Sequence, residues 1–175
     1  MIYFLVGLGN PGDEYFGTRH NVGRDLVGYL RNNDNLSNIK FYVLDEYMNN
    51  SGKAVVKIMV GKKASQLVLI HDDIDLPLGI FKLSFNKGAG GHRGVASVIK
   101  ALKTEEFIRV RVGVSPTTLK GKIRKPCGED KVVKFILGKF KPGENKIIAV
   151  VRKKINQALS VLVKEGKEKA MSLVY

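Results

Sequence analysis

The sequence predicts a single three-layer α/β/α domain with a mixed, mostly parallel central sheet. Short apolar runs at residues 2–6 and 66–70 have the continuous hydrophobic character of buried parallel strands. Segments with helical spacing of apolar residues separate these runs, and such alternation is typical of α/β layers. A chain of 175 residues without internal repeats or a linker suits one domain spanning residues 1–175.

In the first half of the chain, strands are expected at residues 2–6, 40–44 and 66–70. A helix is expected over residues 19–31, and the run of Asn and Asp at 32–35 should end it. Its buried face is predicted to contain Val22, Leu26, Val27 and Leu30. Ser51 can cap a second helix, which is predicted to bury Val55, Val56, Met59 and Val60.

In the second half, strands are expected at residues 79–85 and 107–114, with Arg109 and Arg111 on one face of the latter. A glycine-rich loop at 87–94 leads into a helix whose apolar positions are Val95, Val98, Ile99 and Leu102. After a basic loop at 117–130, a short helix is expected at 132–137. A long helix should then run from beyond Pro142 to about Glu165, burying Ile147, Ile148, Val151, Ile155, Leu159, Leu162 and Val163.

The chain is strongly basic, with a formal net charge of +14 from 30 Lys and Arg against 16 Asp and Glu. A positive field favours polyanionic partners, of which RNA and DNA are the commonest. The alternative is a set of solvated basic faces, as in lysine-rich or heat-adapted proteins. One cysteine excludes an internal disulfide and favours the cytoplasm. The apolar N-terminal run is too short for a signal peptide or a membrane span, so no membrane association is expected.

Several familiar motifs are disfavoured. Residues 7–12 match the dinucleotide pattern G-x-G-x-x-G, but the following helix is expected only near His20, and Pro11 removes a backbone N–H. A nicotinamide-dependent oxidoreductase is therefore a minor alternative. No G-x-S-x-G is present, and Cys127 has no histidine nearby in sequence. Any hydrolysis should therefore use water as the direct nucleophile.

The three histidines are His20, His71 and His92, and each lies at a predicted strand end or in a polar loop. Together with Asp72, Asp73 and Asp75 they raise the possibility of a metal site, but no pair has ligand spacing, so metal-free acid–base chemistry is favoured. For His71 and His92 a structural hydrogen-bonding role is at least as well supported.

His20 is the best candidate for a catalytic base. It precedes a predicted helix, and the strand that ends in Asp72 can bring a carboxylate to the same sheet edge. A neutral imidazole can deprotonate water, and a carboxylate on its other nitrogen selects the tautomer and stabilises the imidazolium. Asn10 and Asn49 lie in turns, where their amides can bind a carbonyl or a developing oxyanion, although turn geometry alone also explains them.

These segments resemble the signatures of bacterial peptidyl-tRNA hydrolases. The matching blocks, in order along the chain, are residues 5–21, 47–55, 71–79, 90–94 and 132–138. The resemblance implies hydrolysis of the ester between a peptide and the 3′ end of tRNA by a monomer without metal or cofactor. It implies His20 as the base, Asp72 as its orienting carboxylate and Asn10 as a contact to the peptide side of the ester. It also implies that Asn49 positions substrate or water, and that Tyr15 and Tyr47 pack against the terminal nucleotide.

The chain departs from the family pattern at Arg93, where the family usually has Asn. From its own chemistry, Arg93 is a candidate contact for a phosphate or the RNA 3′ end, and a solvated surface role is the alternative. The segment 31–46 is shorter than usual, whereas the loop 115–130 is longer and more basic. The basic side chains expected to contact the tRNA backbone include Lys82, Arg109, Arg111, Lys120, Lys122 and Arg124. A weakly active RNA-binding protein on the same scaffold is the alternative function.

Overall fold

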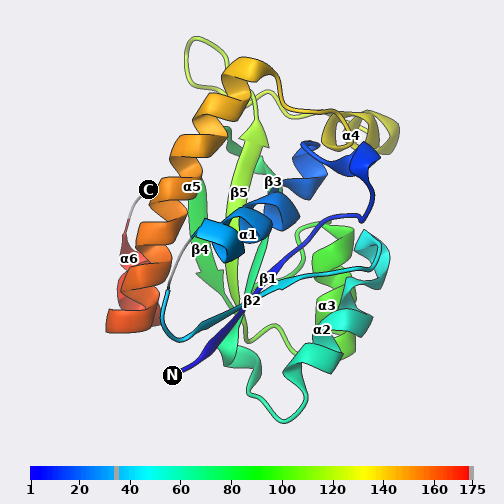
Figure 1. The fold of residues 1–175 in the computed structure, drawn as a ribbon. Coiled ribbons are helices and arrows are strands. Elements are labelled where there is room, and N and C mark those ends of the chain that lie inside the picture. Colours follow the sequence, from blue (N-terminus) through cyan, green and yellow to red (C-terminus); the bar gives the residue numbers. More distant parts are fainter. Residues whose placement is uncertain (34–35, 174–175) are drawn as a thin grey trace.

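The computed structural model describes residues 1–33 and 36–173, which form one five-stranded sheet flanked by helices (Figure 1). The strands are β1 (Tyr3–Gly7), β2 (Ile39–Val43), β3 (Leu67–Pro77), β4 (Phe81–Phe85) and β5 (Ile108–Ser115). Their order is β2-β1-β3-β5-β4; all neighbouring pairs are parallel except β4 and β5. The predicted mixed, mostly parallel sheet is confirmed.

Helices cover both faces of the sheet. One face carries α1 (Val22–Asn33), α5 (Pro142–Glu165) and α6 (Lys167–Ser172), and the other carries α2 (Ser51–Met59) and α3 (Arg93–Leu102). The short helix α4 (Glu129–Ile136) lies instead at the upper end of the molecule in Figure 1. Among the described residues, no helix combines the length and apolar character that a bilayer span requires.

The alternating side chains of the strands divide the hydrophobic core into two clusters. Leu5 and Val68 point to the α1 and α5 side, whereas Val6 and Leu69 point to the α2 and α3 side. All four side chains are fully buried. Because both faces of the central strands are covered, these strands are continuously apolar, which made them recognisable in the sequence.

Gly7 at the end of β1 and Gly23 in α1 allow the helix to pack closely against the sheet. Helix α1 begins only at Val22, after two short 3₁₀ helices, so no helix opens directly on the glycine turn. A Cβ atom on Gly7 would lie 2.3 Å from the carbonyl oxygen of Gly23, and one on Gly23 would lie 2.2 Å from that of Ile70. The absent side chains let α1 lie directly against β1 and β3.

Some details of the predicted elements are wrong. The hydroxyl of Ser51 donates to Met48 O at 2.8 Å and does not cap α2, because the preceding 3₁₀ helix places Ser51 inside the first turn. Val56, Val60 and Ile147 are exposed at 38%, 69% and 41% rather than buried. Val56 and Ile147 lie at the border of the apolar face of their helices, and Val60 follows the last residue of α2. The predicted helix over 19–31 is a 3₁₀ turn followed by α1, which continues to Asn33.

Strand β3 extends beyond its predicted end, and α6 was not predicted. Pairing with β5 continues through Asp72 and Asp73, because a ladder of backbone hydrogen bonds does not depend on the polarity of the side chains. His71, Asp72 and Asp73 therefore lie within a strand rather than after it. The part of the predicted helix-ending run at 34–35 lies outside the described residues.

Candidate active site

A cleft of about 870 Å³ opens at the carboxyl ends of the parallel strands. Its walls come from β3, from the glycine-rich loop before α3 and from α4. Polar groups at the carboxyl edge of an α/β sheet are the usual position for a ligand site. His20, Asn10 and Asp72 all line this cleft.

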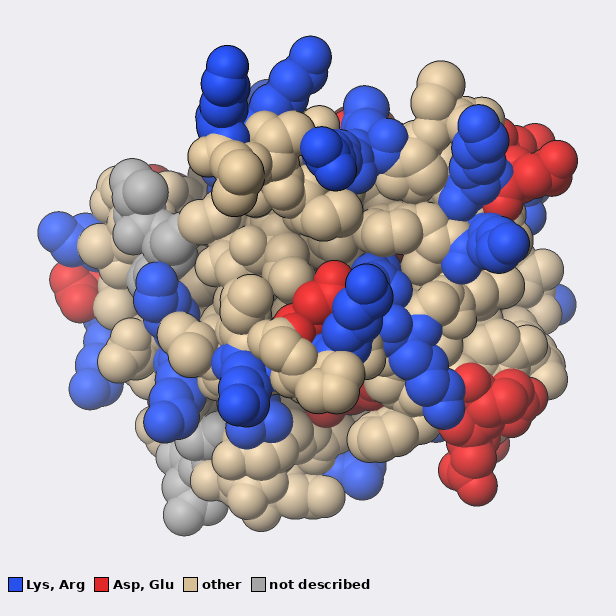
Figure 2. All heavy atoms as spheres, turned by 90° about the horizontal axis from the view of Figure 1, so that it is seen from above, with Lys and Arg blue, Asp and Glu red and all other residues tan. Residues whose placement is uncertain are grey.

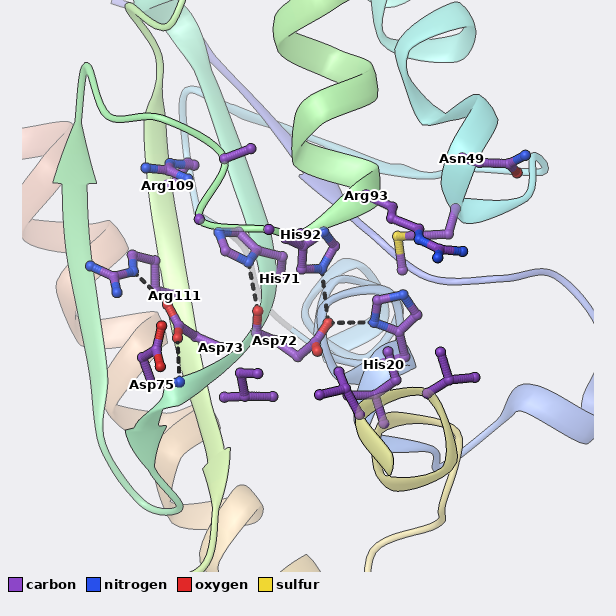
Figure 3. Close-up of a pocket in the computed structure, with 18 of the residues that line it drawn as sticks. His20, Asn49, His71, Asp72, Asp73, Asp75, His92, Arg93, Arg109 and Arg111 are labelled. Carbon is purple, nitrogen blue, oxygen red and sulfur yellow. Dashed lines mark hydrogen bonds and ion pairs between the residues drawn. The ribbon is translucent and has the colours of Figure 1, made fainter. Parts of the chain in front are cut away.

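Two histidines bind the same carboxylate oxygen in the cleft. His20 Nδ1 lies 2.8 Å from Asp72 Oδ1, and His92 Nε2 lies 2.9 Å from that atom (Figure 3). His20 belongs to the 3₁₀ turn η2 (Arg19–Asn21), Asp72 to β3, and His92 precedes α3. These elements meet because β1 and β3 are parallel neighbours: β1 ends at Gly7 beside Ile70, so the segments that follow β1 lie next to Asp72, further along β3.

Hydrogen bonding selects the tautomer of each ring. The backbone N–H of Val95 donates to His92 Nδ1 at 3.2 Å, so in the neutral ring the proton is on Nε2, which donates to Asp72. His20 donates to the same carboxylate through Nδ1, which leaves the Nε2 lone pair available. Within the described part of the chain, His20 Nε2 has no hydrogen-bond partner. His20 therefore has the arrangement of a general base.

The carboxyl group of Asp72 is ionised. Burial raises its pKa, but the charges of His92 and His20 and the hydrogen bonds from both rings outweigh burial, so the pKa lies well below its usual range. Burial, together with the charge of His92, lowers the pKa of His71 well below its ordinary value. His71 is therefore neutral and donates through Nδ1 to the Asp72 carbonyl at 2.7 Å.

Asn10 presents amide N–H groups to the cleft. Its side-chain carbonyl accepts a hydrogen bond from the backbone N–H of Met48 at 2.8 Å. The amide nitrogen has no partner among the described residues, so its donors are available to a ligand. The side chain of Asn21 holds the Asn10 backbone at both ends, accepting from its N–H and donating to its carbonyl, each at 2.8 Å. Asn21 is only 1% exposed, and this clamp links Asn10 to the turn that carries His20.

The other residues predicted to bind substrate lie at the rim of the cleft. The rings of Tyr15 and Tyr47 are perpendicular, with centres 6.4 Å apart, and Tyr47 lines the cleft. Asn49 is exposed at the rim, and its amide points away from His20 and Asp72 in Figure 3. Arg93 also lines the cleft, and its guanidinium pairs with Glu129 of α4 at an exposed position.

A second polar group lies on the neighbouring strands β3 and β5. Arg111 Nε donates to Asp73 Oδ2 at 2.6 Å, and both residues line the cleft. Arg109 is 4% exposed, and burial together with the neighbouring charge of Arg111 lowers its pKa. Figure 2, which views this end of the molecule, shows Lys and Arg side chains flanking a small central group of acidic side chains.

The donor atoms of His20, Asp72 and His92 lie within 4.8 Å of one another, close enough to consider a metal ion. A metal bound by His92 would need the lone pair of Nε2. That nitrogen carries the ring proton, because Nδ1 accepts the hydrogen bond from the Val95 N–H. The hydrogen bonds of this cluster therefore favour acid–base chemistry.

Sequence reasoning missed two contributors to this site. It left His92 with a general structural role, although His92 shares the carboxylate oxygen with His20. It included Asn21 only within the matching block 5–21, although the side chain of Asn21 binds the backbone of Asn10. Neither contact has a signal in local sequence, since each joins residues from separate elements.

Comparisons with known proteins match nearly the whole chain. The family model described as peptidyl-tRNA hydrolase matches residues 4–175. A peptidyl-tRNA hydrolase of Aquifex aeolicus is 39% identical over 97% of this chain and 94% of its own length, and one of Thermotoga maritima is 37% identical over 97% and 95%. The crystal structure of a point mutant of peptidyl-tRNA hydrolase from Acinetobacter baumannii superposes with a TM-score of 0.84 at 26% identity, covering 97% of this chain and 92% of that one.

Proposed function

Because the chain belongs to the peptidyl-tRNA hydrolase family and cleaves the ester of peptidyl-tRNA to recycle the tRNA, we propose that His20 is the general base of this reaction. One observation carries the assignment: His20 Nδ1 lies 2.8 Å from the ionised carboxylate of Asp72 and donates to it, so in the neutral ring Nε2 is the atom that can accept a proton. The alternative of a weakly active RNA-binding protein gives no reason for such a pair.

In the proposed reaction, His20 Nε2 removes a proton from water as the oxygen attacks the ester carbonyl carbon. Asp72 stabilises the imidazolium that forms. Collapse of the tetrahedral intermediate breaks the bond to the 3′ oxygen of the tRNA, which takes the proton back from His20. The products are a free peptide carboxylic acid and a tRNA with a 3′ hydroxyl, so atoms and protons balance.

Asn10 is proposed to bind the carbonyl oxygen on the peptide side of the ester. Its amide nitrogen is free to donate because Met48 N–H occupies the side-chain oxygen. His92 is proposed to hold Asp72 in orientation through its donated hydrogen bond. The chemistry needs no metal or cofactor.

The RNA end is proposed to lie at the rim of the cleft. Tyr15 and Tyr47 offer perpendicular rings, of which the 52% exposed Tyr47 can stack on the terminal base. Asn49 is proposed to contact this nucleotide, with its amide turning inward on binding. Arg93 is proposed to exchange Glu129 for a phosphate near the 3′ end. Lys and Arg side chains around this end of the molecule are proposed to contact the tRNA backbone.

We further propose that the protein is a single-domain, cytoplasmic monomer. The two core clusters share one sheet, which supports a single cooperative unit over residues 1–175. Sedimentation of the purified protein should give one species near the 19.4 kDa of the chain. A single transition in urea, followed by two spectroscopic probes, is expected for one domain.

The test of the proposed base is cleavage of N-acetyl-aminoacyl-tRNA by the parent and by His20→Ala. Loss of the base should lower kcat by about 10²–10⁴-fold. Binding of uncharged tRNA should remain within about twofold, because His20 makes no phosphate contact in this proposal. Cleavage by the variant at the parental rate would show that another group is the base.

A further inference from the structure

Arg19, the residue before His20, is buried and joins the catalytic turn to the segment that follows α4. It is 7% exposed. Its Nη1 donates to the carbonyls of Gly138 and Lys139 at 3.0 and 2.9 Å, and its Nη2 donates to both carboxylate oxygens of Glu144 at 3.0 and 2.8 Å. The guanidinium carbon lies 4.7 Å from the centre of the Phe135 ring of α4.

The backbones of the two segments are joined as well. The N–H of Arg19 donates to Gly138 O at 3.1 Å, and the N–H of Phe140 donates to Gly17 O at 3.0 Å. The end of α4 is therefore held against the turn that carries His20.

Helix α4 itself has no fully buried residue. Apolar side chains of α4 and of Leu137, which follows it, line the cleft that contains His20, and Val133 and Leu137 are 37% and 40% exposed. Phe135 is the side chain of α4 that packs, partly buried, against the core, so core packing positions this wall through one residue. The cleft-facing apolar set is Val132, Val133, Ile136 and Leu137.

We propose that Arg19 and Glu144 are positioning residues that hold the apolar wall of α4 at a set distance from His20, and that this wall selects an apolar side chain on the amino acid next to the scissile ester. The proposal rests on the placement of the ester beside His20. The side chain next to the ester should contact α4 for a geometric reason. If the ester carbonyl lies between Asn10 and His20, the side chain of the same amino acid lies in the same cleft, where α4 supplies apolar surface.

Glu144 offers a substitution that separates this role from general folding. Its Oε2 also accepts the Lys141 N–H at 2.7 Å and so caps α5. Gln keeps the size and the capping oxygen but removes the charge that pairs with Arg19. Arg19→Lys keeps the positive charge but cannot bind two carbonyls and a carboxylate in the forked geometry of a guanidinium.

The experiment measures kcat and KM for N-acetyl-phenylalanyl-tRNA and N-acetyl-glycyl-tRNA with the parent, Glu144→Gln and Arg19→Lys. Loss of the charged pair should lower kcat/KM for the phenylalanyl substrate by about tenfold, mainly through KM, because hydrogen bonds to charged groups are worth more than neutral ones. The glycyl substrate, which has no side chain for α4 to contact, should change by less than about twofold.

Glu168→Gln is the matched control, since this carboxylate on α6 pairs with Lys167 far from the cleft lining. It should leave both substrates unchanged. Ile136→Ala shortens an apolar side chain of α4 directly and should reduce the preference for the phenylalanyl over the glycyl substrate. This variant keeps the Arg19–Glu144 pair, so it tests the proposal even if that pair is necessary for folding.

An equal loss for both substrates, or an unchanged preference in Ile136→Ala, would overturn the proposal. The ratio of the two substrates is independent of which residue is the base. A failure of the His20 assignment would appear as activity in His20→Ala, whereas a failure here would appear as an unchanged ratio.

Discussion

Replacement of Asp72 by Asn tests the electrostatic basis of the proposed mechanism. The substitution preserves the size of the side chain and one acceptor oxygen, but it removes the negative charge that faces His20 at 2.8 Å. In the proposed mechanism His20 gains its positive charge as it takes the proton from water, so the loss is felt mainly as the imidazolium forms. We therefore expect kcat to fall, with little change in KM.

The magnitude follows from the separation of the charges. Two unit charges about 4 Å apart attract by roughly 4 kcal/mol at an effective dielectric constant of about 20. Lost from the transition state alone, this corresponds to a decrease in kcat of about 10³-fold. Because both ring N–H groups can still find the Asn oxygen, the fold should survive, and circular dichroism should confirm this.

The assay is single-substrate cleavage of N-acetyl-aminoacyl-tRNA with kcat and KM determined separately. Asp75→Asn is the matched control, because Asp75 lies on the same strand but pairs with Lys125 at 2.6 Å on the surface, with side chains 51% and 57% exposed. Its kcat should stay within about twofold of the parent. An Asp72→Asn variant that keeps kcat within about fivefold of the parent would refute the role of the carboxylate.

Three further results are expected. Asn21→Ala removes both hydrogen bonds to the buried Asn10 backbone and should lower the free energy of unfolding in urea by about 2–4 kcal/mol; a loss below about 1 kcal/mol would contradict the clamp. Burial raises the pKa of Asp25 to about 6, although the hydrogen bond from the Gly17 N–H and the charge of Arg24 lower it. The protonated carboxyl group therefore makes its full contribution to the free energy of unfolding below about pH 4, and this contribution is lost as the pH rises through about 6. The free energy of unfolding of Asp25→Asn should therefore equal that of the parent near pH 4 and exceed it by about 1 kcal/mol near pH 7.5. Equal free energies of unfolding for the two proteins at both pH values would refute this expectation. Arg111→Gln should reduce the slope of log tRNA affinity against log salt concentration by about 1, and an unchanged slope would exclude Arg111 as a phosphate contact.

Much of the fold was predictable because burial leaves a periodic record in sequence. The central strands are apolar on both faces, and the helices carry their buried side chains at helical spacing, so strands and helices were placed within a few residues. The errors fall where that record is weak. Val60 is apolar but lies where α2 ends, and β3 continues through polar residues because backbone pairing with β5 holds it.

The chain alone predicted which residue types could do the chemistry: a histidine and an asparagine after the first strand, and a carboxylate at the end of a later one. It also determined the basic charge that suits an RNA substrate. Only the tertiary structure decided the partners. That His92 shares Asp72 with His20, that Asn21 clamps Asn10, and that Arg19 binds Glu144 are contacts between segments far apart in the chain. Such contacts depend on strand order and on where each helix crosses the sheet, which no local pattern records.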